Sequence, residues 1–302
     1  MKWRKRGLIY KESGRYSWCR QRTYLPTVDV LDDRLRVYFA SLDDRMVGQV
    51  GWVEVEKDNP SKIIRIAHNP VLVCGDAGLF DENGVTPSWV GDVRGVKVML
   101  YYGWMKTIRS PQILFTGAAD YVPKSDVFRK LANIPYLDRI KEEPIVRSAA
   151  MLLHDSGDIK IYYTGNLSGF EVKFNNVMAP RYTIKYNTES TLHESNQLLY
   201  LKDNEFGLAR PWVIKDGIED YKMWYSIRSL DHPYKMGYAV SKDGIYWTRK
   251  DEEVGITWSE QGWDSEMICF PCVVDVDEHR YMFYNGNKHG ESGFGYAELE
   301  ED

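Results

Sequence analysis

The sequence predicts an all-β protein, a five-bladed β-propeller with four antiparallel strands in each blade. Three observations support this fold. A short aromatic strand pattern followed by a turn of small residues occurs five times, at intervals of about 60 residues. An apolar strand pattern precedes each copy at a steady offset. The five units use nearly the whole chain, so we expect residues 1–302 to form a single propeller domain.

The two strand patterns of each unit have different expected places in a blade. The aromatic copies occupy residues 37–40, 100–103, 161–166, 223–226 and 280–287. The apolar copies occupy residues 25–28, 86–90, 148–152, 211–214 and 270–274. We expect the apolar copies to be the innermost strands, with their first residues at the mouth of the central channel.

The two ends of the chain are expected to complete one blade together. Residues 7–10 form a short apolar strand that has no partner within the first unit. The last strand pattern, residues 294–299, needs a neighbour on its outer edge. Pairing of these two segments would close the ring. Between them, the third unit carries a long insertion at 167–180, and long loops on a rigid scaffold often bear function.

Composition excludes some classes of function. The formal net charge is −5, so no global basic field attracts nucleic acid or an anionic membrane. No segment approaches the roughly 20 apolar residues of a membrane span. The basic start, residues 1–7, is followed by no apolar run, so we expect no secretory signal and a cytoplasmic location. Aromatic residues make up 14% of the chain, which suits β-strands and surfaces that stack on flat ligands.

Several motifs together resemble a known superfamily. They are the aromatic strands, the hairpin at 241–247 with its Asp243-Gly244 turn, the blade entry at 80–88 and the turn at 284–287. They are similar to those of the arabinanase/levansucrase/invertase superfamily, which includes glycoside hydrolase family 43. The resemblance spans all five units and implies a five-bladed propeller with a glycosidase-like active site at its mouth. Within the superfamily the chain looks most similar to uncharacterised cytoplasmic members associated with polysaccharide biosynthesis.

The chain departs from family 43 at the catalytic positions that the resemblance implies. The family places an Asp before the inner-strand proline of blade one, an Asp in blade three and a Glu before the proline of blade four. Here these positions hold Leu25, Arg147 and Arg210. Ordinary glycoside hydrolysis needs two carboxyl groups, so the family's catalytic set cannot be transferred to this chain.

Arginines in place of carboxylates indicate a positive mouth. We expect Arg147 and Arg210 at equivalent places facing the axis, and Arg20 and Arg22, just before the inner strand of the first unit, could join them. One interpretation is that they hold a ligand carboxylate or phosphate. The other is that carboxylates shortly before the inner strands neutralise them in ion pairs between blades; these are Asp81, Glu82, Glu143, Glu205, Asp264 and Glu266.

Two of these carboxylates are candidates for proton transfer. Asp81 lies in a Gly-rich entry, residues 75–84, where tight turns can aim a side chain. Glu266 is the second choice, and the two could form an acid/base pair in which one charge raises the other pKa. The alternative for Asp81 is a structural role in which it caps its own turn.

Aromatic residues near the mouth could stack on sugar rings. The candidates are Trp18, Trp89, Trp104, Trp212 and Trp263. Each of them could instead pack in the core. His289 follows the last aromatic strand and could reach the mouth or belong to a surface loop.

The sequence indicates no cofactor. Its histidines have no metal-ligand spacing, and it contains no phosphate-binding glycine loop. Cys269 and Cys272 have C-x-x-C spacing, but they lie in a predicted strand, so we interpret them as buried thiols rather than a zinc or redox site.

The sequence therefore supports three functional hypotheses. The first is a carbohydrate-active hydrolase or transferase that acts on an anionic glycoside such as a sugar phosphate or nucleotide sugar. The second is a non-catalytic propeller that binds a glycan or sugar phosphate and has lost the family carboxylates. The third is a phosphorylase in which arginines hold inorganic phosphate as the nucleophile.

Overall fold

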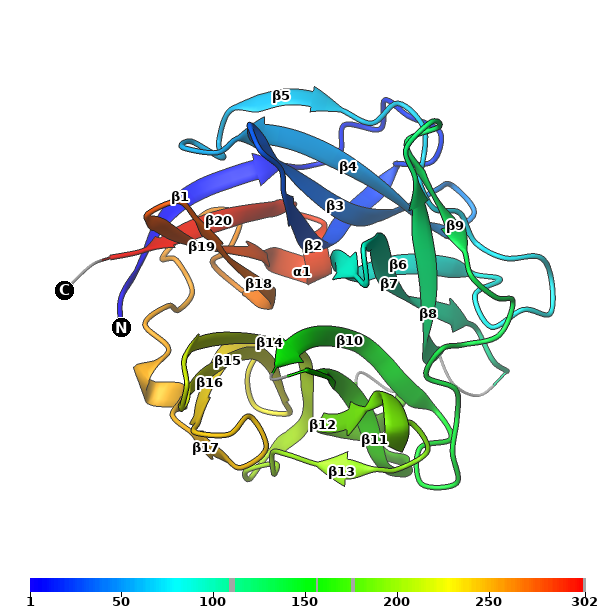
Figure 1. The fold of residues 1–302 in the computed structure, drawn as a ribbon, viewed down its shortest axis with the longest axis vertical. Helices are drawn as coiled ribbons and strands as arrows, with labels where there is room; N and C mark the ends of the chain where they lie inside the picture. The colour runs from blue at the N-terminus through cyan, green and yellow to red at the C-terminus, as the bar shows by residue number, and fades with distance from the viewer. Residues whose placement is uncertain (109–111, 156, 175–176, 301–302) are drawn as a thin grey trace.

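The chain folds into a ring of five four-stranded blades, seen down its shortest axis in Figure 1. The structure is a computed structural model that describes residues 1–108, 112–155, 157–174 and 177–300. Blades 1 and 2 consist of β2 (Gln21–Val30), β3 (Arg34–Leu42), β4 (Gly48–Glu56), β5 (Ile63–Ile66), β6 (Gly84–Val93), β7 (Val96–Met105), β8 (Ile113–Val122) and β9 (Val127–Lys130). In both blades, strands that follow one another along the chain pair antiparallel.

The next two blades repeat this order. They consist of β10 (Val146–Asp155), β11 (Asp158–Phe174), β12 (Val177–Thr188), β13 (Asn196–Gln197), β14 (Glu205–Gly217), β15 (Asp220–Ser229), β16 (Lys235–Ser241) and β17 (Trp247–Arg249). Two 3-10 turns, η1 (Glu189–Thr191) and η2 (Asp251–Glu253), lie beside their outer strands. Short parallel contacts join an outer strand of one blade to the first strand of the next, as between β12 and β14.

Blade 5 contains both ends of the chain, which confirms the predicted closure. It consists of β18 (Cys269–Val276), β19 (His279–Asn285), β20 (Phe294–Leu299) and β1 (Trp3–Tyr10). The N-terminal strand pairs antiparallel with β20 from Trp3 opposite Leu299 to Tyr10 opposite Phe294 (Figure 1). This pairing covers the outer edge of β20, so the N-terminal strand completes blade 5 and closes the ring. A short helical turn, α1 (Asn287–Gly290), connects β19 to β20.

The insertion in the third unit is a hairpin rather than a loop. Strands β11 and β12 stay paired from Lys160 opposite Thr188 to Phe174 opposite Val177, with irregular register between Asn166 and Val172. Residues 170–174 alternate apolar and charged types, the pattern of a strand, and this explains why the ladder continues.

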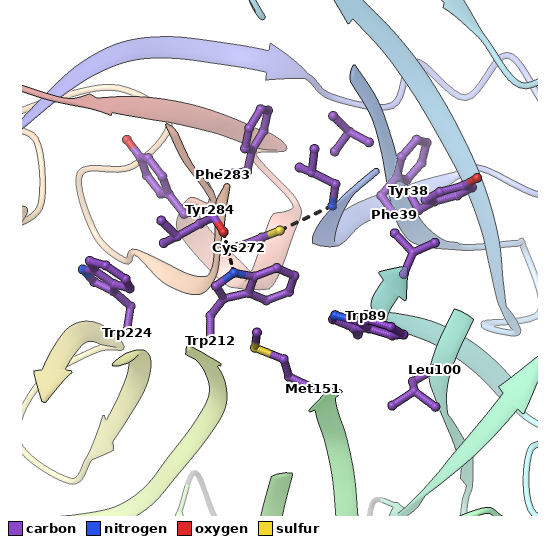
Figure 2. Close-up of a cluster of buried hydrophobic side chains, with 14 of the residues drawn as sticks. Tyr38, Phe39, Trp89, Leu100, Met151, Trp212, Trp224, Cys272, Phe283 and Tyr284 are labelled. Atoms are coloured by element: carbon purple, nitrogen blue, oxygen red, sulfur yellow. Dashed lines mark hydrogen bonds between the residues drawn. The ribbon is translucent and has the colours of Figure 1, made fainter. Parts of the chain in front are cut away.

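Apolar and aromatic side chains fill the spaces between blades. Figure 2 shows Trp89, Met151, Trp212 and Cys272 pointing toward one another from four different inner strands. Trp212 Nε1 donates a hydrogen bond to the carbonyl oxygen of Val273 in the adjoining blade at 2.5 Å. This packing supports the interpretation of Cys272 as a buried thiol.

Every innermost strand has a register shift close to its start. The shifts lie between Tyr24 and Thr27, Pro87 and Trp89, Ser148 and Met151, Ala209 and Trp212, and Cys269 and Cys272. Leu25, Arg210 and Phe270 lie in three of these bulges, each directly before a proline and with φ between 52° and 60°. A bulge redirects side chains, so these residues point differently from their neighbours in the ladder.

No helix in the described part of the chain is long and apolar enough to cross a membrane.

Candidate functional site

Arg210 lies where the inner strands of three blades meet. It belongs to β14 in blade 4, and its side chain is buried. One terminal nitrogen donates to the Ser88 carbonyl of blade 2, and the other donates to Thr27 Oγ1 of blade 1 at 2.9 Å. Contacts from blade 4 to blades 1 and 2 place the guanidinium across the ring, near its axis.

Among the described residues, no carboxylate forms an ion pair with the Arg210 guanidinium. Its hydrogen-bond acceptors are two carbonyl oxygens and one hydroxyl. The guanidinium also lies 5.2 Å from the Trp212 ring. Burial lowers the pKa of Arg210 to about 10, so it is still a cation at neutral pH.

Arg147 does not face the axis, and the expected equivalence with Arg210 is wrong. Ser148 pairs with Thr164 in blade 3, as Ala209 pairs with Ser226 in blade 4. Arg147 therefore lies before the bulge of its strand, whereas Arg210 lies inside one. The side chains of Arg147 and Arg210 therefore point in different directions.

The Arg147 guanidinium is satisfied inside blade 3. Its Nε lies 2.5 Å from Glu143 Oε2. Its terminal nitrogens donate to the carbonyl oxygens of Asp138 at 2.8 Å and Leu192 at 2.9 Å. These contacts give Arg147 a structural role.

The structure does not bring Asp81 and Glu266 together. The Asp81 carboxylate is buried in blade 2, where Lys130 Nζ lies 2.5 Å from Oδ2 and the Tyr101 hydroxyl donates at 3.4 Å. Glu266 is exposed in the segment before β18, and its backbone N–H donates to Asn287 Oδ1 at 2.8 Å. The two carboxyl groups thus belong to different blades and have no partner in common.

The buried carboxylates before the inner strands form ion pairs within their own blades. Each is within 2.8 Å of a lysine or arginine of an outer strand: Asp81 with Lys130, Glu143 with Lys185, Glu205 with Arg249 and Asp264 with Lys5. The four carboxylates therefore form ion pairs, as one of the two interpretations predicted. The pairs lie within blades, whereas the prediction placed them between blades. None of the four pairs includes Arg210.

The other predicted ligand-binding residues lie in different surroundings. Arg20 is exposed and donates to the Gly14 carbonyl. Trp212 packs in the core, and Trp263 stacks on Tyr284 with ring centroids 5.1 Å apart. Trp104 is buried and lies at the mouth end of β7, opposite Gly84.

His289 lies at the mouth in a group of aromatic and basic residues that the sequence did not predict. Its ring is 5.1 Å from Tyr234 and 6.2 Å from Phe270. Arg228 Nη1 donates to the Tyr182 hydroxyl at 3.2 Å, and the Tyr182 and Tyr234 hydroxyls are also 3.2 Å apart. We call this group, completed by Arg22 from the adjacent start of β2, the mouth cluster: Arg22, Tyr182, Arg228, Tyr234, Phe270 and His289.

The mouth cluster comes from four blades. Tyr182 and Arg228 both pair with Gly207, at the beginning of an inner strand. Phe270 is the second residue of β18, and His289 is in α1, which contacts β2. Chain segments more than a hundred residues apart thus converge at the end of the ring where the inner strands start.

The mouth cluster holds two cations, Arg22 and Arg228, and the exposed Glu291 carboxylate lies 3.2 Å from Arg22 Nη2. Burial, and then the nearby charges of Arg228 and Arg22, lowers the pKa of His289 to about 4, so its imidazole is neutral. Burial raises the pKa of Tyr234 well above its usual range, so its phenol stays neutral and can donate. The cluster combines guanidinium donors with aromatic rings, which suits a ligand that carries both an anionic group and a flat apolar face.

The low pKa of His289 predicts a pH-dependent stability. Between pH 6.5 and 4 the unfolded state binds more protons at this site than the folded state, so stability is complete above pH 6.5 and declines as pH falls toward 4. We expect His289→Asn to remove about 1–3 kcal/mol of this acid-dependent loss. Asparagine tolerates the left-handed φ of 55° at this position.

The measurement is urea unfolding of the wild type and of His289→Asn at about pH 7 and about pH 4.5. Carboxylates titrate in both proteins. The comparison is therefore between the fall in unfolding free energy on acidification in the wild type and the same fall in His289→Asn. Equal losses in the two proteins would show that the imidazole is not held neutral.

Part of the mouth cluster has a signal in the sequence. Phe270 precedes Pro271 as Arg210 precedes Pro211 and Leu25 precedes Pro26, so it occupies the recurring bulge at the mouth. Arg228 follows an aromatic strand at its mouth end. Tyr182, within β12, and Tyr234, in the connection between β15 and β16, have no comparable signal, because only ring closure brings them to the mouth.

The ring is shared with solved carbohydrate-active enzymes. A thermostable family-43 glycoside hydrolase superposes with a TM-score of 0.67 and 17% identity, over 93% of this chain and 91% of that one. A structure from the GH130 family of mannoside phosphorylases, which contains glycoside hydrolases that target β-1,2 mannosidic linkages in Candida mannan, has a TM-score of 0.70 and 13% identity, over 99% and 93%. The GH43_1 enzyme from Xanthomonas citri complexed with xylose has a TM-score of 0.61 and 14% identity, over 97% and 89%. At these identities the similarity shows the fold alone.

Sequence comparison gives full-length relatives. The uncharacterized protein Rv1502 of Mycobacterium tuberculosis (strain ATCC 25618 / H37Rv) is 29% identical over 307 residues, covering 99% of this chain and all of the relative. The uncharacterized protein MT1551 of strain CDC 1551 / Oshkosh matches to the same extent. No family model matches the chain.

Proposed function

We propose that this propeller binds an anionic carbohydrate, such as a sugar phosphate or a nucleotide sugar, at the mouth cluster. One observation carries the proposal: the guanidiniums of Arg22 and Arg228 lie among the aromatic rings of the mouth, and the carboxylate that pairs with Arg22, Glu291, is exposed, so that an anionic ligand can compete with it. Guanidiniums bind phosphate or carboxylate, while aromatic rings take the apolar face of a sugar. The structural neighbours act on carbohydrates, which supports this class of ligand.

The site favours binding over hydrolysis by a carboxylate pair. Such hydrolysis needs two carboxyl groups roughly 5–9.5 Å apart with room for the substrate between them. The predicted pair fails on geometry, because Asp81 is enclosed with Lys130 and Glu266 is exposed in another blade. A catalytic role of either residue without the other, and a place in cytoplasmic polysaccharide biosynthesis, stay predictions.

A phosphorylase is the second candidate, and the charge of the mouth favours it over a hydrolase. In phosphorolysis the nucleophile is inorganic phosphate, so the protein must hold an anion and supply one proton donor. The mouth cluster offers two guanidiniums for the anion and the Tyr234 phenol as a hydrogen-bond donor, while its raised pKa makes that phenol a weak acid. Phosphate-dependent release of a sugar 1-phosphate from an oligosaccharide would identify this activity.

The proposal predicts a specific response to ligands. Sugar 1-phosphates or nucleotide sugars at about 100 times their dissociation constant should stabilise the protein by about 2.7 kcal/mol, observed as a raised Tm. Neutral trisaccharides of mannose, xylose and arabinose should have a smaller effect at this site. His289→Asn and Arg22→Gln should weaken binding of the anionic compounds, since each alters the mouth cluster.

The control is Arg20→Gln, which removes an exposed guanidinium outside the mouth cluster. This variant should bind as the wild type does. If the wild type responds to neutral oligosaccharides alone, or if Arg20→Gln weakens binding as much as Arg22→Gln, the anion site is not at the mouth.

A further inference from the structure

A second concave surface lies on the rim of the ring, between blades 3 and 4. Its volume is about 1050 Å³, near the upper end of the roughly 300–1,000 Å³ typical of ligand clefts. It is lined by residues 186–202 around β13 and by residues 245–249 of β17 and the preceding turn. We call it the rim cleft; none of the mouth cluster residues lines it.

The rim cleft presents aromatic side chains to solvent. Tyr200 is 73% exposed and Tyr246 is 81% exposed, although both belong to a large aromatic type that usually packs more deeply. Tyr200 lies in the connection from β13 of blade 3 to β14 of blade 4, and Tyr246 lies in the turn before β17 of blade 4. Exposed tyrosine faces on two walls of a cleft provide stacking surfaces for sugar rings, and their hydroxyls can still form hydrogen bonds.

The polar groups of the rim cleft suit a neutral ligand. Its two cations are already neutralised: Lys202 Nζ is 2.9 Å from Asp251 Oδ2, and Arg249 forms ion pairs with Glu205 at 2.8 Å and Asp251 at 2.7 Å. One further carboxylate lines the cleft, that of Glu194, and it accepts a hydrogen bond from Asn196 Nδ2 at 3.1 Å. The remaining polar lining consists of hydroxyls and side-chain amides: Thr188, Thr191, Ser195, Asn196, Gln197 and Thr248. Such groups are both donors and acceptors, which matches the hydroxyls of a neutral sugar.

The walls of the rim cleft are fixed by contacts from beneath. Trp247 Nε1 donates to the Gly244 carbonyl at 3.0 Å, and its ring packs edge-on against Tyr162 of blade 3 at 6.2 Å. Arg249 Nη1 donates to the Tyr200 carbonyl at 2.7 Å, which ties the two walls together. A cleft held in this way loses little conformational freedom when it binds.

We propose that the rim cleft is a second carbohydrate site that binds a segment of a neutral polysaccharide. It would act independently of the mouth cluster, so that the protein holds a polymer at its rim as well as a small anionic carbohydrate at its mouth. Neither ligand depends on the other, and the two proposals can fail separately.

The test is native gel electrophoresis of the full chain through gels that contain mannan, arabinan, xylan or dextran. We expect at least one polymer to retard the wild type, and Tyr200→Ala and Tyr246→Ala each to weaken the apparent affinity by about tenfold, as loss of an aromatic anchor does. Tyr246→Phe should keep most of the affinity because it keeps the ring. Both tyrosines are exposed, so these variants should fold, which Tm measurements check.

Two controls separate the rim cleft from other surfaces. Ile218→Ala removes an equally exposed side chain, 89% accessible at the turn between β14 and β15, and should leave retardation unchanged. His289→Asn alters the mouth cluster and should also leave it unchanged. No retardation by any of the four polymers, retardation that survives Tyr200→Ala/Tyr246→Ala, or retardation abolished by His289→Asn would each overturn the proposal.

Discussion

Replacing Glu143 with glutamine is expected to lower the free energy of unfolding by about 3–5 kcal/mol, enough to unfold many domains. Glu143 is fully buried, with Oε2 at 2.5 Å from Arg147 Nε and Oε1 at 2.8 Å from Lys185 Nζ. The Tyr163 hydroxyl donates to the same carboxylate at 3.1 Å. A neutral amide would leave two buried cations without an anion, which is the costly way to break a buried ion pair.

The adjacent Glu142 provides a matched control for this change. It has the same side chain but is exposed, so Glu142→Gln should change stability by less than about 0.5 kcal/mol. The measurement is urea unfolding of both variants beside the wild type. Similar values for the two substitutions would show that the Glu143 carboxylate is not the counterion of Arg147 and Lys185.

The same contacts explain why the sequence predicted the ring but not the direction of Arg147. The period of the strands and the unpartnered apolar segment near the start require only that every apolar face be buried and every edge be covered. Such requirements are visible in the sequence, and β1 does pair with β20. The direction of one side chain depends on the position of a bulge, and Ser148 shows no sign in the sequence that the bulge follows it.

The carboxylates illustrate a second limit of sequence analysis. The sequence places Asp81 and Glu143 shortly before inner strands, and this position is compatible both with an ion pair and with a role in proton transfer. The choice between them is made by Lys130 and Lys185, which lie 49 and 42 positions further along the chain and reach the carboxylates only in the folded blade. Nothing in the local sequence identifies these partners.

The mouth cluster shows a third limit. The position of His289 after the last aromatic strand allows either the mouth or a surface loop, and its ring lies against Tyr234 and Phe270. Arg228 and Tyr182 come together because blades 3 and 4 are adjacent in the ring. A site assembled from several blades can be located by its end of the ring, but its members become neighbours only after closure.

We expect replacement of Arg210 to change both the free energy of unfolding and the affinity for an anion at the mouth. Arg210→Met should reduce the free energy of unfolding by about 1–3 kcal/mol, because it leaves the Ser88 carbonyl and Thr27 Oγ1 without their donor. Part of this loss is offset. Burial lowers the pKa of Arg210 to about 10, so burying its charge costs stability, and methionine does not incur this cost. Arg210→Ala should lose about 2 kcal/mol more, since it also leaves a cavity between the blades.

Arg210→Met should also weaken the binding of an anion at the mouth cluster. A charge about 8 Å from a bound anion, at an effective dielectric near 20, contributes about 2 kcal/mol, or roughly a thirtyfold change in dissociation constant. Calorimetric titration of a sugar 1-phosphate into wild type, Arg210→Met and the exposed control Arg20→Met measures this effect. If Arg210→Met binds the anion as well as Arg20→Met does, the buried guanidinium serves only to join blades 1, 2 and 4, and the positive potential of the mouth comes from Arg22 and Arg228 alone.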